Sequence, residues 1–325
     1  MIVIRKFKGF AYVKGLSLLV AVFLLFLFIQ PGKEDGPLFM RRTFPQEQQK
    51  GAAANAFQFA FLSDLHKGWG VFKPIMKEIA RDENSFAVIG GDIVAQNKGD
   101  RYRFVLRELT EVKGPPPLYF VTGNHDVYDY ADNPEYSLEN FRRYCGPDDY
   151  WFFWGNAAFI VLNDARLTIT NDQFHWLQDT LRMARGRFAH IFVFMHIPPF
   201  DPREGQSYCL PKSDGEKFMA LMEKFGVTYV FCGHIHCYFR EVINGVIYII
   251  AGGAGGGLKC PDSFYHYVRV SVQGEVIEDS VIKVQKDWRL EITGDIKYEL
   301  RVRKPFLLSF LTVAMGQSFL YFFAL

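Results

Sequence analysis

The chain has 325 residues, with 37 Lys and Arg against 35 Asp and Glu, so its net charge is only +2. This near-neutral balance argues against a dominant nucleic-acid-binding surface, which needs a strong positive excess. The length predicts one domain of about 220–240 residues with additional terminal segments.

The N-terminal segment, residues 1–30, is expected to be a membrane anchor or a signal-like segment. Basic residues at positions 5, 6, 8 and 14 precede an apolar run, and residues 10–29 are numerous enough to cross a bilayer as a helix. The sequence Gln30-Pro31-Gly32 is a poor cleavage site, so an uncleaved anchor is favoured over a removed signal peptide. Residues 31–56 are then a linker. The basic start favours an exported domain on the periplasmic or extracellular side, although Arg41 and Arg42 weigh against that orientation.

Strand and helix patterns alternate through the middle of the chain. Short β-rich apolar runs predict strands at residues 57–62, 86–89, 118–121, 158–162, 191–195 and 229–232. Helical patterns between them predict helices at residues 72–81, 102–111, 172–185 and 216–225. Thr170 and Gln173 have the spacing of a capping box at the start of the third helix. This alternation predicts βαβ units and therefore parallel strands.

The later strands follow one another without helices. They are predicted at residues 237–243, 246–250, 266–272 and 276–284. A glycine-rich stretch, residues 251–257, follows the second of them. It is either a phosphate-cradling loop or a tight crossover near the site, and the second is favoured because no helix begins there.

Polar residues form five short blocks, and each block follows an apolar run. The blocks are Ser63-Asp64-Leu65-His66, Gly90-Gly91-Asp92, Gly123-Asn124-His125-Asp126, Met195-His196-Ile197-Pro198 and Gly233-His234-Ile235-His236. Open α/β sheets place their sites at the carboxyl ends of strands, so we expect these blocks to converge. Carboxylate, imidazole and amide ligands suit a pair of divalent first-row metals.

The order D-x-H, G-D, G-N-H-D, H and G-H-x-H resembles the calcineurin-like metallophosphoesterase superfamily, over roughly residues 57–280. The resemblance implies an α/β fold, a four-layer αββα sandwich with mixed sheets, for a catalytic domain at residues 57–300. It also implies two divalent metal ions, with manganese, iron or zinc as candidates. One metal would be held by Asp64, His66 and His236, the other by Asn124, His196 and His234, with Asp92 bridging the two.

The resemblance further implies metal-dependent hydrolysis of a phosphomonoester or phosphodiester by a metal-bridging hydroxide. His125 stands beside a ligand and is the general-acid candidate, and Asp126 is predicted to orient its imidazole. Asp126 could instead be a plain turn carboxylate. The alternative function is a non-catalytic metal-binding scaffold that recruits a partner. Ala95 stands where purple acid phosphatases carry a tyrosine, so a tyrosinate–iron(III) centre is not expected.

Two loops are predicted to shape substrate choice. They are residues 67–74 and 198–215, in which Lys67 or Arg203 could hold a phosphate or could be solvated loop charges. The odd cysteine count of five predicts at least one free thiol, and thiolate ligation by Cys232 or Cys237 is a minor alternative. The remaining histidines match no block and are expected at the surface or an interface: His175, His190 and His266.

The C-terminal tail, residues 305–325, has no charged side chain. It is expected to be a second membrane segment, or a helix that lies on a bilayer or a partner. The predicted partners are therefore a phosphorylated substrate, which the membrane segments favour as a lipid-linked one, and the membrane itself. No nucleic acid is expected.

Overall fold

The computed structural model describes residues 56–82, 84–130 and 135–303. The chain divides into two compact units: residues 37–294 form the larger one, and residues 1–36 together with 295–325 form the smaller one. Three predicted segments lie outside the described residues: the anchor, the linker except for residue 56, and the C-terminal tail. Within the described ranges, no helix has the length and apolarity that a membrane crossing requires.

The first sheet of the larger unit has five strands in the order β11-β10-β1-β2-β3. The strands β1 (Ala56–Leu62), β2 (Phe86–Ile89) and β3 (Leu118–Phe120) are parallel. The strands β10 (His266–Gln273) and β11 (Val276–Lys283) complete the sheet in antiparallel pairs. Leu62 pairs with Ile89, and Ile89 pairs with Phe120, so the three parallel strands end side by side.

The second sheet has six strands in the order β4-β5-β6-β7-β9-β8. Its parallel centre consists of β5 (Ala157–Val161), β6 (His190–Phe194), β7 (Tyr229–Cys232) and β9 (Val246–Ala251). Antiparallel strands close both edges: β4 (Tyr150–Trp154) and β8 (Tyr238–Ile243). Both sheets are therefore mixed, as the resemblance predicted.

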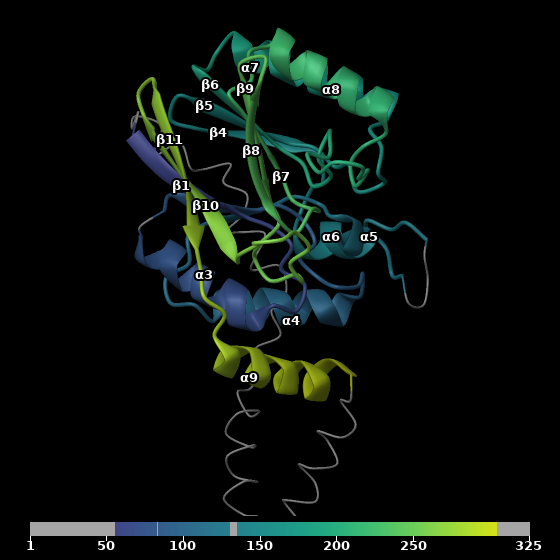
Figure 1. Cartoon of the computed structure of the whole chain (residues 1–325), viewed down its shortest axis with the longest axis vertical. Coiled ribbons are helices and arrows are strands. Elements are labelled where there is room, and N and C mark those ends of the chain that lie inside the picture. The colour runs from purple at the N-terminus through teal and green to yellow at the C-terminus, as the bar shows by residue number, and fades with distance from the viewer. Residues whose placement is uncertain (1–55, 83, 131–134, 304–325) are drawn as a thin grey trace, which may run out of the picture. The chain divides into compact units, whose positions relative to one another are not determined.

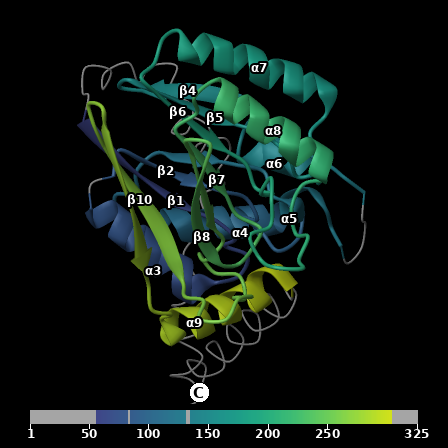
Figure 2. The same ribbon diagram turned by 45° about the horizontal axis from the view of Figure 1, so that its top comes forward.

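Helices cover the outer faces of the two sheets (Figures 1 and 2). The helices α3 (Trp69–Arg81) and α4 (Gly99–Thr110) lie against the first sheet, and α7 (Asn171–Arg185) and α8 (Lys212–Lys224) lie against the second. This arrangement is the predicted αββα sandwich. The short helices α5 (Asn124–Val127) and α6 (Glu139–Tyr144) follow β3, and α9 (Trp288–Tyr298) leads into a π-helical turn, η2 (Glu299–Arg303). The predicted capping box of α7 is confirmed, since Thr170 Oγ1 accepts a hydrogen bond from the Gln173 amide at 3.2 Å.

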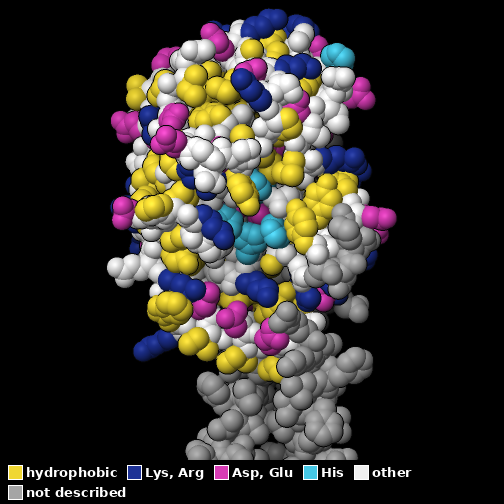
Figure 3. Space-filling view, turned by 45° about the vertical axis from the view of Figure 1, so that its right-hand side comes forward, with side chains coloured by type: hydrophobic (Ala, Val, Ile, Leu, Met, Phe, Trp, Pro, Cys, Tyr) yellow, Lys and Arg dark blue, Asp and Glu magenta, His cyan; other side chains and the backbone are white. Residues whose placement is uncertain are grey.

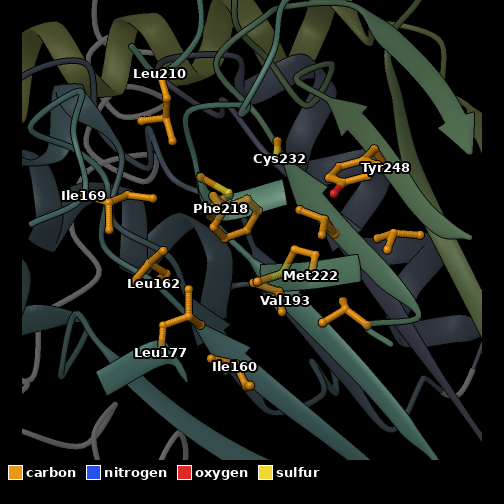
Figure 4. Packing of buried hydrophobic residues seen from close by; sticks show 14 of the residues in the cluster. Ile160, Leu162, Ile169, Leu177, Val193, Leu210, Phe218, Met222, Cys232 and Tyr248 are labelled. Atoms are coloured by element: carbon orange, nitrogen blue, oxygen red, sulfur yellow. The ribbon is translucent and has the colours of Figure 1, made fainter. Parts of the chain in front are cut away.

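Alternation along the strands divides their side chains between two cores. In β6, Phe192 faces the other sheet, whereas Val193 faces α7 and α8. The core between the sheets is rich in phenylalanine, and the rings of Phe159 and Phe192 stack with centroids 5.0 Å apart. The core beneath α7 and α8 is mainly aliphatic, as Figure 4 shows around Val193 and Met222. The large phenylalanine content of the chain is thus partly explained by the space between the sheets.

Three expectations of the sequence are wrong. Residues 69–74 belong to α3 rather than to a loop, because Trp69 is fully buried and Pro74 is accommodated inside the helix. A proline lacks the amide hydrogen that would bond the carbonyl four residues earlier. That carbonyl, of Gly70, instead accepts a hydrogen bond from the amide of Asp287 at 2.8 Å. His190 and His266 are buried and not at the surface.

Candidate metal centre

The five polar blocks meet at the carboxyl ends of the parallel strands. β1 and β2 end in register, and the loops after them are joined by backbone hydrogen bonds from Asp64 to Gly91 and from His66 to Asp92, each 3.1 Å long. The second sheet joins this group because the amide of His234 donates to Asp64 Oδ2 at 3.0 Å. In Figure 3 histidine side chains gather in one hollow of the face shown, with an acidic side chain among them.

The side chains predicted for the first metal form one compact group. Each of Asp64, His66, Asp92 and His236 offers a ligand atom, and these atoms all lie within 4.8 Å of one another. His236 Nε2 lies 3.2 Å from Asp64 Oδ1, and His66 Nε2 lies 3.5 Å from Asp92 Oδ2. This group could hold a divalent cation.

Of the side chains predicted for the second metal, His196 adjoins the other oxygen of Asp92. His196 Nε2 lies 3.4 Å from Asp92 Oδ1, and the rings of His196 and His234 have centroids 5.3 Å apart. Asn124 begins α5, and the amide of the next residue, His125, donates to Asp92 Oδ1 at 2.8 Å. The two carboxylate oxygens of Asp92 therefore each lie beside a histidine of a different predicted ligand set, which is the placement that a bridging carboxylate needs. Its bridging role remains a prediction.

Three buried ligand atoms of the candidate centre have no hydrogen-bond partner among the residues that the structure describes: His66 Nε2, His196 Nε2 and Asn124 Oδ1. Leaving such atoms unpaired away from water is costly, and buried polar atoms in native proteins are almost always satisfied. Each of these atoms can offer a lone pair to a cation. The described residues therefore fit divalent metal ions.

Backbone strain is concentrated at the same residues. Asp64, His66, Asp92 and His234 have φ angles of 63°, 46°, 49° and 66°, in the left-handed region that L-residues rarely adopt. Each such conformation costs on the order of 1–3 kcal/mol and persists where surrounding structure imposes it, often at functional sites. In the described part of the chain, seven non-glycine residues have positive φ, and four of them are these predicted ligands.

Glycines allow the blocks to approach one another. A Cβ atom on Gly123 would overlap the backbone of Asp92, and one on Gly233 would overlap the hydroxyl of Ser63. The glycine-rich segment after β9 packs against the first block in the same way. Its amides donate to that block's backbone, from Ala254 to Ser63 at 3.0 Å and from Gly256 to Asp64 at 2.7 Å. These bonds favour the crossover interpretation over a phosphate cradle.

Hydrogen bonds to backbone carbonyls orient two of the histidines. His196 Nδ1 donates to the Gly90 carbonyl and His236 Nδ1 donates to the Gly257 carbonyl, each at 2.8 Å. Because a carbonyl only accepts, Nδ1 carries a proton, and Nε2 is the ring atom that could bind a metal ion.

The buried carboxylate of Asp164 also supports the site, and it was not predicted from the sequence. It accepts hydrogen bonds from the amides of His196, at 3.0 Å, and Ile197, at 2.7 Å. The signal was present, because Asp164 follows β5, the one predicted strand of the parallel series that leads into no polar block. Burial, against weaker opposing effects of His196 and backbone hydrogen bonds, raises the pKa of Asp164 to about 7.

The electrostatics of the centre suit cations. Burial alone would raise the pKa of Asp92, but the electrostatic effects of His196 and His66 outweigh burial and lower it. Burial would also raise the pKa of Asp64, but the opposing effect of His236 is larger and lowers this pKa to about 2. Burial lowers the pKa of both His66 and His234 to about 4, so these imidazoles are neutral ligands at neutral pH.

The general-acid candidate His125 is oriented differently from the prediction. Its Nδ1 lies 3.1 Å from the carbonyl of Ala95, which leaves Nε2 available to a substrate. Asp126 is the third residue of α5, and its carboxylate turns back to accept from the amide of Gly123 at 2.9 Å and from that of Val94 at 3.2 Å. The prediction that Asp126 orients the imidazole is therefore wrong: Asp126 caps α5 and ties this loop to the one after β2.

The loop between β6 and α8 places aromatic and charged groups at the rim. The ring of Tyr208 lies 5.7 Å from that of His234. Arg203 forms a bidentate ion pair with Asp201, at 2.9 and 2.7 Å, so it is not a solvated loop charge.

The cysteines are not ligands of the centre. Cys237 forms a disulfide with Cys260, which excludes its thiolate as a metal ligand. Cys145, Cys209 and Cys232 are free, in agreement with the odd count, and burial raises the pKa of the Cys232 thiol well above its usual value.

Comparison with known proteins agrees with this geometry. The fold and the clustered donor set are those of a metallophosphoesterase-type domain. The family model for calcineurin-like phosphoesterases matches residues 57–238, and the chain belongs to this family.

Curated relatives are similar over part of the chain. A serine/threonine-protein phosphatase CPPED1 from Bos taurus is 35% identical over 168 residues, which cover 46% of this chain and 53% of that protein. The protein of the same name from Danio rerio is 32% identical over 214 residues, 61% of this chain and 66% of the relative. The chain thus spans about half the length of the first of these relatives.

Among solved structures, a purple acid phosphatase from yellow lupin aligns with a TM-score of 0.56. The alignment covers 74% of this chain and 56% of the lupin protein. At 14% identity this likeness concerns the fold alone.

Proposed function

We propose that the chain is a metal-dependent hydrolase of phosphoesters. The observation that carries this proposal is the approach of His66 and His196 to the two oxygens of Asp92. Their Nε2 atoms, like Asn124 Oδ1, are buried without a hydrogen-bond partner among the described residues. The metals would be held by Asp64, His66, Asp92 and His236 on one side, and by Asn124, His196, His234 and again Asp92 on the other. Manganese, iron and zinc are the candidate ions.

Two divalent ions at such a site supply Lewis acidity, which lowers the pKa of water and neutralises charge on phosphoryl oxygens. The protein supplies orientation. The carbonyl of Gly90 fixes the His196 ring, and Asp164 fixes its backbone, so that the ligand geometry exists before substrate arrives.

In this proposal, His125 would act as the general acid and protonate the leaving group. The Ala95 carbonyl accepts from Nδ1, so Nε2 is the atom that would donate a proton to the departing oxygen. The edge of its ring meets the ring of His66, with centroids 4.8 Å apart, which puts the acid beside the candidate centre.

The substrate class and the cellular placement are further parts of the proposal. The relatives named serine/threonine-protein phosphatases favour a phosphomonoester, and the apolar terminal segments favour a lipid-linked substrate at a membrane. The catalytic domain is proposed to span residues 57–300. The disulfide between Cys237 and Cys260 supports an exported domain, because disulfides persist in oxidising compartments.

The test is hydrolysis of a chromogenic phosphomonoester and a chromogenic phosphodiester by the full chain, with manganese added and with a chelator. We expect turnover that the chelator abolishes. A chain that binds close to two ions and hydrolyses neither compound would instead be the non-catalytic scaffold. The exposed His175 provides a control, because His175→Ala should leave turnover unchanged.

A further inference from the structure

Tyr130 lies at the edge of the candidate metal centre and contacts two of its residues. Its hydroxyl oxygen is 3.0 Å from Asn124 Nδ2, and its ring lies 5.1 Å from that of His125, in an edge-to-face arrangement. About half of the Tyr130 side chain is exposed, at 53%, so burial in a core does not explain its position.

The two ends of the Asn124 amide have opposite surroundings. Nδ2 donates to the Tyr130 hydroxyl, whereas Oδ1 is buried without a hydrogen-bond partner in the described structure. The hydroxyl oxygen can accept or donate, so it is compatible with either orientation of the amide. A metal cation binds only the oxygen of an amide side chain. When Oδ1 is directed to the ion, the NH₂ group needs a hydrogen-bond acceptor, which the Tyr130 hydroxyl provides.

We propose that Tyr130 is a positioning residue with two separate actions. Its hydroxyl holds the amide of Asn124 so that Oδ1 faces the metal, and its ring packs against His125 and keeps that imidazole over the substrate position. This proposal rests on the proposed function, since it assigns a role to Tyr130 in the same metal centre.

The two actions can be separated by two substitutions. Tyr130→Phe removes the hydroxyl and keeps the ring, so it should weaken the binding of one metal ion. Tyr130→Ala removes both, so it should also disturb His125. Tyr130 is exposed and lies outside both cores, so neither change should prevent folding.

Tyr136 offers a matched control in the same chain. Its hydroxyl accepts a hydrogen bond from Asn163 Nδ2 at 2.9 Å, which is the same pair of groups at nearly the same distance. Asn163 is not a predicted ligand. Tyr136→Phe therefore removes an equivalent hydrogen bond without changing the orientation of a metal-binding amide.

The experiment is manganese titration of the metal-stripped full chain, followed by turnover of a chromogenic phosphomonoester at limiting and at saturating manganese. Tyr130→Phe should lower the affinity for one of two ions by about 10- to 100-fold, the usual effect of losing a group that orients a ligand. Its turnover should recover at saturating manganese. Tyr130→Ala should keep a kcat deficit of roughly 2- to 10-fold there, the worth of one aromatic contact.

The outcomes separate this inference from the function on which it rests. If the parent binds two ions and Tyr130→Phe binds them as tightly as Tyr136→Phe does, the positioning role is refuted and the proposed function stands. If the parent binds none of manganese, iron(II) and zinc in the same titration, both are refuted. If Tyr130→Ala behaves like Tyr130→Phe at saturating manganese, the action on His125 is refuted.

Discussion

Reducing the disulfide between Cys237 and Cys260 should lower the free energy of unfolding of the domain by about 3 kcal/mol. The bond closes a loop with a sequence separation of 23 residues. In the chain-entropy model, a cross-link that closes a loop of this length lowers the entropy of the unfolded chain, which stabilises the folded state by about 3 kcal/mol at 25 °C. For a domain of this size, each kcal/mol corresponds to roughly 2–4 °C in Tm.

The same loop supports a predicted metal ligand. The carbonyl of Gly257, which lies inside it, accepts from His236 Nδ1 at 2.8 Å, and the amide of Lys259 donates to the His236 carbonyl at 3.2 Å. Reduction should therefore also weaken metal retention, because the ring of His236 loses the restraint that directs Nε2 towards Asp64.

The assay is urea unfolding of the full chain, with and without a dithiol reductant, with metal content measured at each step. The control is the double substitution C237S and C260S, which should match the reduced parent and be insensitive to reductant. Three free cysteines remain in both proteins, so effects of the reductant on them cancel: Cys145, Cys209 and Cys232. If parent and double variant unfold at the same urea concentration without reductant, the disulfide does not stabilise the fold and the predicted stabilisation of about 3 kcal/mol is refuted.

Other features of the structure give three further predictions. His125→Ala should lower turnover by about 100- to 10,000-fold, the usual worth of a general acid, and leave metal content unchanged; a parallel loss of metal would show that His125 holds the ions. Phe159→Ala should cost about 3–5 kcal/mol in urea unfolding, because this ring is fully buried between the sheets; a cost below 1 kcal/mol would contradict the packing. Burial lowers the pKa of His266 from 6.5 to about 4, so its neutral form contributes stability that is complete above pH 6.5 and is lost as the pH falls to 4. That contribution is about 3 kcal/mol. His266→Gln should flatten the stability profile between these two pH values, and an unchanged slope would refute the assignment.

The sequence predicts much of the fold because periodicity and local capping are strong signals. The strands predicted at residues 86–89 and 229–232 coincide with β2 and β7, and the Thr170 capping box begins α7. The edge strand β4 was not predicted, because its aromatic sequence, Tyr150–Trp154, lacks alternation and its partner is set by tertiary pairing with β5.

In the candidate site, too, the sequence predicts some features and not others. The polar blocks could be read from the sequence because each directly follows a strand, and strands in register bring their ends together. The partners of those residues could not be read. The acceptor of the His125 ring is a backbone carbonyl, of Ala95, and the disulfide partner of Cys237 is one of four other cysteines. A backbone carbonyl has no residue type to recognise, and cysteine pairing depends on distances that spacing does not determine.

The two-metal centre is tested most directly by elemental analysis of the purified full chain beside the Asp92→Asn variant. We expect close to two divalent first-row ions per parent chain, and clearly fewer in the variant, because the carboxylate between the two ligand sets loses its charge. A parent without transition metals, or a variant that retains them in full, would contradict it.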